Sequence, residues 1–148
     1  MRSYIDKLEK LKIGWNRRSL TENDFYQLCR RFRVTVVEMP LVTNGFYYCV
    51  KGRHFIAIST RLPRIEKLLV MFHEFAHFLM HSPDTNTTAS FHGLGRKTRK
   101  EREADAFALC AIIPRCWMES HELSELIDEG FPAKILKERV QILEQLGL

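Results

Sequence analysis

An apolar stretch in the middle of the chain, IEKLLVMFHEFAHFLMH, lies between Pro63 and Pro83 and contains neither glycine nor proline. Proline is tolerated in the first turn of a helix but not further in, so this stretch predicts one long helix. His73 and His77 would then lie one turn apart on the same face, with Glu74 beside them. Unpaired His and Glu side chains are costly to bury among Phe, Leu and Met. A metal ion bound by both imidazoles would remove that cost. The alternative is that these are only polar residues of an apolar helix, satisfied by contacts within the protein.

Three short runs ahead of this helix are rich in β-branched and aromatic residues, which favours strands. The runs are VTVVEM at 34–39, GFYYCV at 45–50 and RHFIAIS at 53–59. Lys51 and Gly52 form a link short enough for a tight hairpin between the second and third runs. We expect a small, three-stranded, mainly antiparallel sheet that packs against the long helix and leaves one edge where an extended peptide can pair.

The remaining segments favour helices. Apolar residues recur at helical spacing over 3–15, and Thr21 with Asp24 three residues later is typical of a helix N-terminus. A further helix is expected from about Lys97 to Pro114, and shorter helical segments after Ser120 and Pro132. The predicted fold class is therefore α+β.

The chain has 148 residues, 45% of them apolar and 28% charged, which suits one globular domain. We expect a single domain over 1–148, with its core at about 21–114 and a C-terminal helical segment at 115–148. No apolar run is long enough for a membrane span or a signal peptide, so the expected location is the cytoplasm.

The formal net charge of +5 permits contact with nucleic acid but does not show it, and the densest basic run lies at 95–102. Charge runs are more often solvated surface. Four scattered cysteines without a C-x-x-C pair are expected to be small buried side chains rather than ligands.

H-E-x-x-H alone is a weak indication of a metal site, because two histidines supply only part of a ligand set. Zn²⁺ in hydrolytic sites takes three protein ligands and keeps one position open. In EREADAF, Glu101 and Asp105 are four residues apart on one helical face. One of them can bind the ion while the other orients a ligating histidine.

The order of these segments resembles the ImmA/IrrE family of metallo-endopeptidases, in the glutamate-liganded (gluzincin) branch of the zincin superfamily. The resemblance covers about 21–114. It rests on a helix and short sheet ahead of the motif, on HEFAHFLMH, and on EREADAFALCAIIP, which is similar to the family's E-x-[EQ]-A-[ND]-x-F-A block followed by proline. It implies a zincin-like fold and one Zn²⁺ per chain.

The resemblance implies that His73, His77 and Glu101 bind the metal, that Glu74 is the general base, and that Asp105 lies behind a ligating histidine. Two departures from the family pattern, Phe-Ala between the histidines and Cys-Ala-Ile-Ile before the proline, do not touch the chemistry.

Two further residues are alternative ligands. Glu103 is the fallback carboxylate, and His81 continues the four-residue ladder of histidines. One straight helix spreads three such ligands far along its axis, so His81 ranks below Glu101. A histidine at a helix C-terminus also interacts favourably with the exposed carbonyls. For the residue that would stabilise an oxyanion, the candidates are Tyr47, Tyr48, His54 and His92.

The resemblance implies an endopeptidase that cleaves a specific intracellular protein, often a helix-turn-helix repressor of the Xre type, in mobile-element or stress regulation. The alternative is a non-proteolytic regulator that binds metal or associates with DNA, or a toxin–antitoxin-like partner that acts by binding alone. Chelators and Glu74→Gln should abolish the first activity, whereas affinity for nucleic acid should fall steeply with salt.

Overall fold

The computed structural model describes residues 2–81 and 98–148, and its helices and strands give an α+β fold consistent with the zincin-like class. The elements are, in chain order, α1 (Arg2–Lys10), α2 (Glu22–Arg31), β1 (Val34–Met39), β2 (Gly45–Val50), β3 (Arg53–Ser59), α3 (Arg64–His81), α4 (Arg99–Ile112), α5 (Arg115–Ser120), α6 (Leu123–Asp128) and α7 (Ala133–Leu146). The predicted fold class is confirmed.

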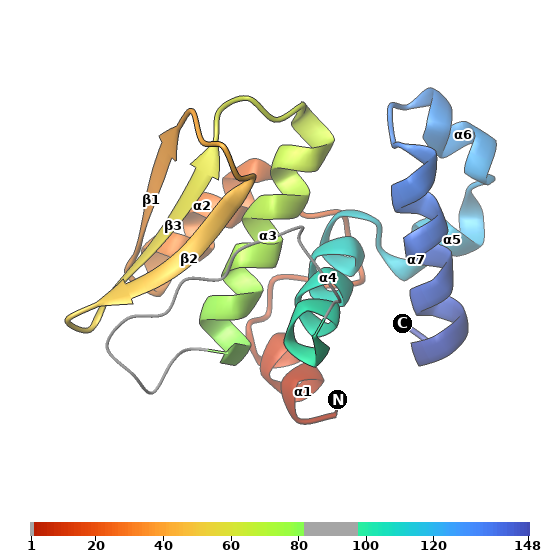
Figure 1. Cartoon of the computed structure of the whole chain (residues 1–148). Coiled ribbons are helices and arrows are strands. Elements are labelled where there is room, and N and C mark those ends of the chain that lie inside the picture. The colour runs from red at the N-terminus through yellow and green to blue at the C-terminus, as the bar shows by residue number, and fades with distance from the viewer. Residues whose placement is uncertain (1, 82–97) are drawn as a thin grey trace. The chain divides into compact units, whose positions relative to one another are not determined.

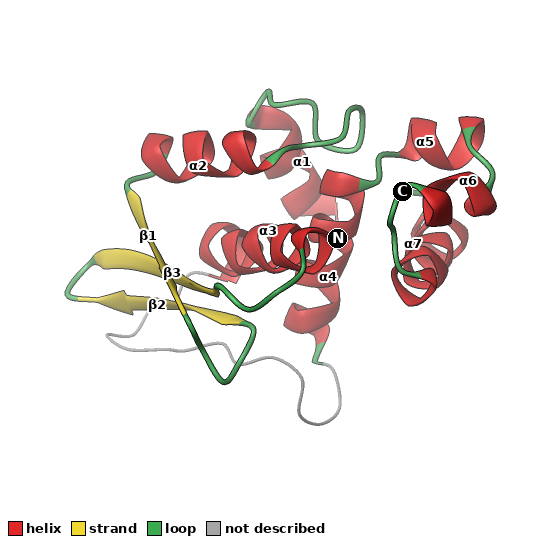
Figure 2. Cartoon of the chain, turned by 90° about the horizontal axis from the view of Figure 1, so that it is seen from above, coloured by secondary structure: helices red, strands yellow, loops and turns green. Residues whose placement is uncertain are grey.

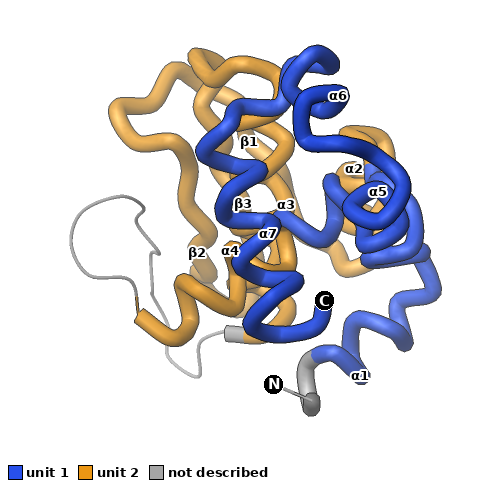
Figure 3. Tube along the Cα trace, turned by 90° about the vertical axis from the view of Figure 1, so that its right-hand side faces the viewer, with its two compact units in different colours: residues 1–20, 109–148 blue, residues 21–108 orange. Residues whose placement is uncertain are grey.

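The chain divides into two units, coloured separately in Figure 3. Unit 1 comprises 1–20 and 109–148, and unit 2 comprises 21–108, so the chain passes from unit 1 to unit 2 after Leu20 and returns to unit 1 within α4. The expectation of a single domain over 1–148 stays a prediction.

The sheet of unit 2 has the strand order β1-β3-β2, as Figure 1 shows. β2 pairs antiparallel with β3, but β1 pairs parallel with β3, so the sheet is mixed rather than mainly antiparallel. The reason lies in β3: Ile56, Ala57 and Ile58 are all at most 2% exposed. Such a continuous buried run suits a central strand, and β3 therefore lies between the two strands that precede it in sequence.

The hairpin predicted between the second and third runs is present. Lys51 and Gly52 have φ values of 50° and 74°. Positive φ at both central residues is the signature of the tight turn whose twist matches that of the flanking strands. This turn sets the register that places Tyr48 opposite Phe55 and Cys49 opposite His54.

α2 and α3 lie on the same side of the sheet, with α2 against β1 and α3 against β2 and β3 (Figures 1 and 2). α2 begins with the capping box predicted for Thr21 and Asp24. The predicted packing of the motif helix on the sheet is thus confirmed.

Phenylalanines fill the interior of unit 2. Phe72 on α3 contacts Phe25 on α2, and Phe75 and Phe72 both contact Phe107 on α4, with ring centroids 5.9 to 6.4 Å apart. These four side chains are all 0% exposed. Because the rings flank the motif residues in sequence, their packing fixes the rotation of α3 and the position of α4 beside it.

Unit 1 differs from the sequence-based expectation in the length of its first helix and in the number of its C-terminal helices. The first helix stops at Lys10 rather than near Trp15, because Lys12 and Gly14 adopt positive φ and lead the chain into turns. Leu11 and Trp15 are nevertheless buried. Towards the C-terminus the structure has three helices, and α5 directly after Pro114 was not expected from the sequence.

Candidate metal centre

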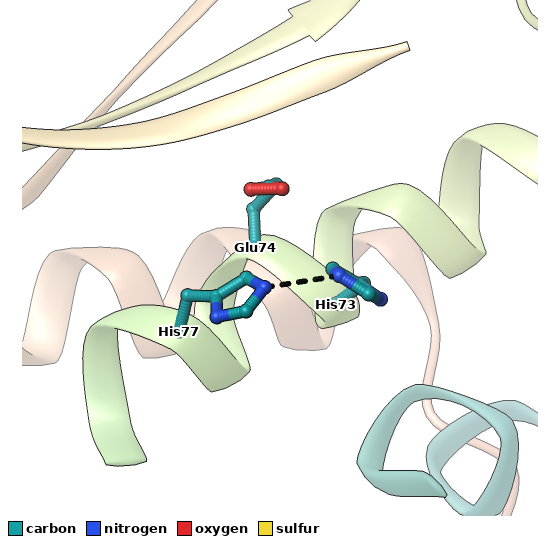
Figure 4. Close-up of side chains that lie close together, drawn as sticks. All are labelled: His73, Glu74 and His77. Atoms are coloured by element: carbon teal, nitrogen blue, oxygen red, sulfur yellow. Dashed lines mark hydrogen bonds between the residues drawn. The ribbon is translucent and has the colours of Figure 1, made fainter. Parts of the chain in front are cut away.

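α3 brings the two motif histidines together on one buried face. His73 is 6% exposed and His77 is 2% exposed. Their Nε2 atoms lie 3.1 Å apart, and Figure 4 shows the two imidazoles side by side on the helix. As predicted from their four-residue spacing, His73 and His77 lie on one face of α3, and their ring nitrogens point towards one another.

α4 contributes a carboxylate at the same point. Oε2 of Glu101 lies 3.0 Å from Nε2 of His73, and Oε1 of Glu101 lies 2.9 Å from Nε2 of His77. Asp105, one turn further along α4, has Oδ1 2.7 Å from Nδ1 of His73. Glu101 and Asp105 thus hold the two nitrogens of the same ring from a single helical face.

The separations between these atoms suit a small divalent ion. Two ligands at about 2.0–2.1 Å from one tetrahedral Zn²⁺ lie about 3.3 Å apart. The three separations among His73, His77 and Glu101 are 2.9 to 3.1 Å, so small outward shifts would admit the ion. Two imidazoles and a carboxylate are also a donor set that zinc accepts in hydrolytic sites. The residues present fit the metal that the sequence predicts.

The carboxylates also set the charge of the metal-free cluster. Burial works to lower the pKa of His73, but its hydrogen bonds to Asp105 and Glu101 prevail and raise it to about 9. Burial works to raise the pKa of Glu101, but the hydrogen bonds to His73 and His77 prevail and hold it well below its usual range. The two carboxylates of α4 therefore favour the protonated form of the His73 ring as long as no metal ion is bound.

Glu74 is 0% exposed and lies beside the two histidines. Figure 4 shows its carboxylate above α3, on the side where the strands pass. One ligand atom each from His73, Glu74 and His77 lie within 4.8 Å of one another, close enough to surround an ion. Glu74 thus belongs to the same cluster as the histidines, and Glu101 approaches their Nε2 atoms from α4.

Of the two lower-ranked candidate ligands, Glu103 has a partner on its own helix, and the side chain of His81 lies outside the described part of the chain. Glu103 forms an ion pair with Arg99, 3.3 Å away on the same helix. His81 is the last residue of α3, and its side chain is outside the described part of the chain. Cys29, Cys49, Cys110 and Cys116 are free thiols, the first three of them buried.

A tyrosine–histidine pair lies on the sheet face that packs against α3. The hydroxyl of Tyr47 is 2.8 Å from Nδ1 of His54, and both rings contact Phe78, the residue after His77. Sequence reasoning named the two residues separately and missed the pair, because their proximity depends on the register between β2 and β3. Tyr48 instead stacks on Phe55. His92 is outside the described residues.

A family model described as Peptidase_M78, the IrrE N-terminal-like domain, matches residues 29–134. This match covers more than two thirds of the chain and contains His73, Glu74, His77, Glu101 and Asp105. The chain belongs to this family. The resemblance to the ImmA/IrrE proteins is thereby confirmed. No curated protein and no solved structure gave a match to the chain.

Membership of the IrrE N-terminal-like family makes the chain a metallopeptidase of the IrrE/ImmA kind, whose substrates are proteins. The cluster of His73, Glu74 and His77 is where a metal ion fits. Among the helices that the structure describes, none combines the length and apolar character needed to cross a bilayer.

Proposed function

We propose that the chain is a zinc-dependent endopeptidase in which His73, His77 and Glu101 hold one Zn²⁺ and Glu74 is the general base. The observation that carries the proposal is the approach of three ligand side chains from two helices, whose nearest nitrogen and oxygen atoms lie 2.9 to 3.1 Å apart, with Asp105 behind His73. The family match across all these positions supports it.

A bound zinc ion would polarise a peptide carbonyl and would lower the pKa of a water molecule to about 7. Glu74 accepts a proton from the attacking water and returns it to the departing amine. Its burial keeps bulk water away and strengthens its interaction with the charges around it. Asp105 keeps the proton of His73 on Nδ1, which leaves Nε2 free to bind metal.

The substrate that we propose is a specific protein, a helix-turn-helix repressor of the Xre type, as the resemblance to ImmA/IrrE proteins implies. β2 is an edge strand of the described sheet and lies against α3, the helix that carries Glu74. An extended segment of the substrate can add to such an edge through main-chain hydrogen bonds. The proposed location is the cytoplasm, where a repressor would be encountered.

The test is cleavage of a regulator encoded beside this chain, using wild-type protein, Glu74→Gln and a control, Glu66→Gln. Glu66 lies in the first turn of the same helix and is partly exposed. Glu74→Gln keeps the shape of the side chain but cannot accept the proton, so cleavage should slow by about 10²–10⁴. Glu66→Gln should cleave like the wild type. Equal cleavage by all three proteins would remove Glu74 from the mechanism.

The same experiment distinguishes the regulatory alternative. A metal-binding or DNA-associated regulator, or a toxin–antitoxin-like partner, would bind the repressor or its operator and leave both intact. In that case Glu74→Gln would behave like the wild type in cells, and any affinity for DNA would fall steeply with salt. Exposed Arg99, Lys100 and Arg102 at the start of α4 are the described part of the basic run that such binding would use.

A further inference from the structure

The short helix α6 in unit 1 exposes two apolar side chains. Leu123 and Ile127 are 44% and 48% exposed, and their four-residue spacing places them one turn apart on the helix surface. Of the six residues of α6, only Leu126 is buried. Apolar side chains scattered singly over a surface are ordinary, but two neighbours on so short a helix form a continuous apolar patch.

The segment around this patch is acidic. Residues 119–129 contain neither lysine nor arginine, although the whole chain has a formal net charge of +5. The segment has five acidic side chains, all of them exposed: Glu119, Glu122, Glu125, Asp128 and Glu129. Its charge is therefore opposite in sign to that of the chain as a whole.

The chain itself supplies few counter-charges to these carboxylates. Glu119 pairs with Arg115, whose Nε lies 2.9 Å from Glu119 Oε1 on α5. None of the other four acidic side chains forms an ion pair within 2–81 and 98–148. Most of the negative charge of this segment is therefore available to a partner.

The two ends of α6 use their carboxylates differently. At the start, Glu125 Oε1 accepts a hydrogen bond from the backbone N–H of Glu122 at 3.2 Å, which caps the helix. At the other end, Asp128 is the last helical residue and Glu129 is the C-cap. Negative charge is unfavourable there, because the exposed carbonyls already make a helix C-terminus negative. The stability of α6 therefore does not explain Asp128 and Glu129.

The charge of this surface selects the class of partner that fits it. α6 and α7 are joined by a turn at Gly130 and lie side by side (Figures 1 and 2), an arrangement that also occurs in DNA-binding proteins. Carboxylates would repel the phosphates of nucleic acid. A basic amphipathic helix is complementary instead. Its apolar residues would meet Leu123 and Ile127 while its lysines or arginines pair with the carboxylates.

We propose that the α6 surface, formed by Leu123, Ile127, Asp128 and Glu129, is a docking site for a basic amphipathic helix of the protein substrate. The inference rests on the proposed function, in which the substrate is a DNA-binding repressor, because such proteins carry clustered lysine and arginine. The surface belongs to unit 1, whereas all the proposed metal ligands belong to unit 2. A second point of attachment raises the effective concentration of the substrate at the first.

The test measures how tightly the regulator encoded beside this chain binds to it, by isothermal titration calorimetry. Every protein in the series carries Glu74→Gln so that the regulator is not consumed. Adding Ile127→Gln should raise the Kd about tenfold, as loss of an apolar contact at the centre of an interface commonly does. Adding Asp128→Asn and Glu129→Gln together should also raise the Kd, and should make it less sensitive to sodium chloride.

Two residues of α7 in the same unit supply matched controls. Leu146 is 43% exposed, and Glu144 is an exposed carboxylate. Leu146→Gln and Glu144→Gln should bind the regulator with the Kd of the parent protein. All the substituted side chains lie at the surface, so circular dichroism should show the parent fold. If one α6 variant does not fold, the other decides.

Cleavage of the regulator by the protein with Glu74 intact separates this proposal from the proposed function. If the regulator is cleaved but the α6 variants bind it like the controls, the docking site is wrong and the proposed function stands. If the regulator binds through the α6 surface and is not cleaved, the docking site stands and the proposed function is wrong. A regulator that is neither bound nor cleaved would overturn both.

A second copy of this chain is the other occupant that the test must distinguish. Analytical ultracentrifugation of the chain alone should show no association that depends on the α6 surface. An oligomer that dissociates on Ile127→Gln but not on Leu146→Gln would assign the surface to self-association and overturn the proposal.

Discussion

Asp105 Oδ1 lies 2.7 Å from Nδ1 of His73, while Nε2 of the same ring lies 3.0 Å from Glu101 Oε2. Both carboxylates come from α4 and are one helical turn apart. The ring of His73 is therefore held from both nitrogens, and its orientation towards His77 is set by a helix other than its own.

Asp105→Asn should weaken zinc binding without removing it. The amide keeps the size of the side chain but loses the charge that orients His73, and such outer partners typically contribute about 10–100-fold to metal affinity. The dissociation constant is measured by competition with a chelating dye. Glu103→Gln on the same helix is the control and should bind zinc like the wild type, because Glu103 pairs with Arg99.

Glu101→Gln should have a larger effect than Asp105→Asn, since it removes a proposed ligand rather than the residue behind one. We expect zinc affinity to fall by about 100-fold or more. Circular dichroism should show an unchanged fold. If Glu103→Gln lost zinc and Glu101→Gln kept it, the third ligand would be Glu103 and the fallback assignment would replace the first.

Much of this arrangement follows from the sequence because it depends on local spacing. The four-residue steps from His73 to His77 and from Glu101 to Asp105 each define one face of a helix. The capping box at Thr21 and the turn at Lys51-Gly52 are equally local signals, and both are present. That the two helical faces meet was expected from the resemblance and is consistent with the packing of phenylalanines from three helices.

Features that depend on long-range pairing were harder to predict. The strand order β1-β3-β2 arises because β3 is buried on consecutive residues, a pattern that does not say which neighbour lies on which side. The Tyr47–His54 pair follows from that register. The complete burial of Arg139 on α7 gave no signal at all, because a lone arginine on an amphipathic helix is normally exposed.

Gly45 is predicted to be essential for the close approach of β2 to its neighbours. A Cβ at this position would lie 2.7 Å from the Ala57 carbonyl oxygen and 2.8 Å from Val70 Cγ1. Gly45→Ala should therefore lower the free energy of unfolding by about 1–3 kcal/mol in urea titrations.

A double-mutant cycle with Val70→Ala separates the two contacts of Gly45. Removing the valine methyl relieves one clash but leaves the backbone oxygen, so part of the cost should remain. Wild-type stability of Gly45→Ala would show that β2 can move away from α3 without penalty.

Glu38 on β1 should make unfolding sensitive to acid. Its carboxylate accepts from Tyr26 on α2 and pairs with Lys67 on α3, and the hydrogen bond from Lys67 lowers its pKa below the usual 4.5. Because the pKa of Glu38 is lower in the folded state than in the unfolded state, the ionised carboxylate stabilises the fold at pH values above its unfolded-state pKa. This stabilisation is lost as the pH falls through the folded-state pKa. The contribution is thus present at pH 7 and absent at strongly acidic pH.

Glu38→Gln should lower the free energy of unfolding by about 0.2–1 kcal/mol at pH 7. The effect is small because the Glu38 side chain is 35% exposed and solvent screens its ion pair with Lys67. The cost should shrink as the pH falls below about 4. Urea titrations across this range measure it, with Glu9→Gln, an exposed carboxylate on α1, as the control. A cost independent of pH would mean that packing rather than charge explains the effect.

The central claim is that one metal ion joins α3 to α4 through His73, His77 and Glu101. Anomalous diffraction at the zinc edge, from crystals of the zinc-loaded protein, tests it most directly. We predict one strong peak at about 2.0–2.2 Å from Nε2 of His73, Nε2 of His77 and an oxygen of Glu101, with Asp105 on Nδ1 of His73. A peak bound by cysteine, by Glu103 in place of Glu101, or at no position between the two helices would contradict the account.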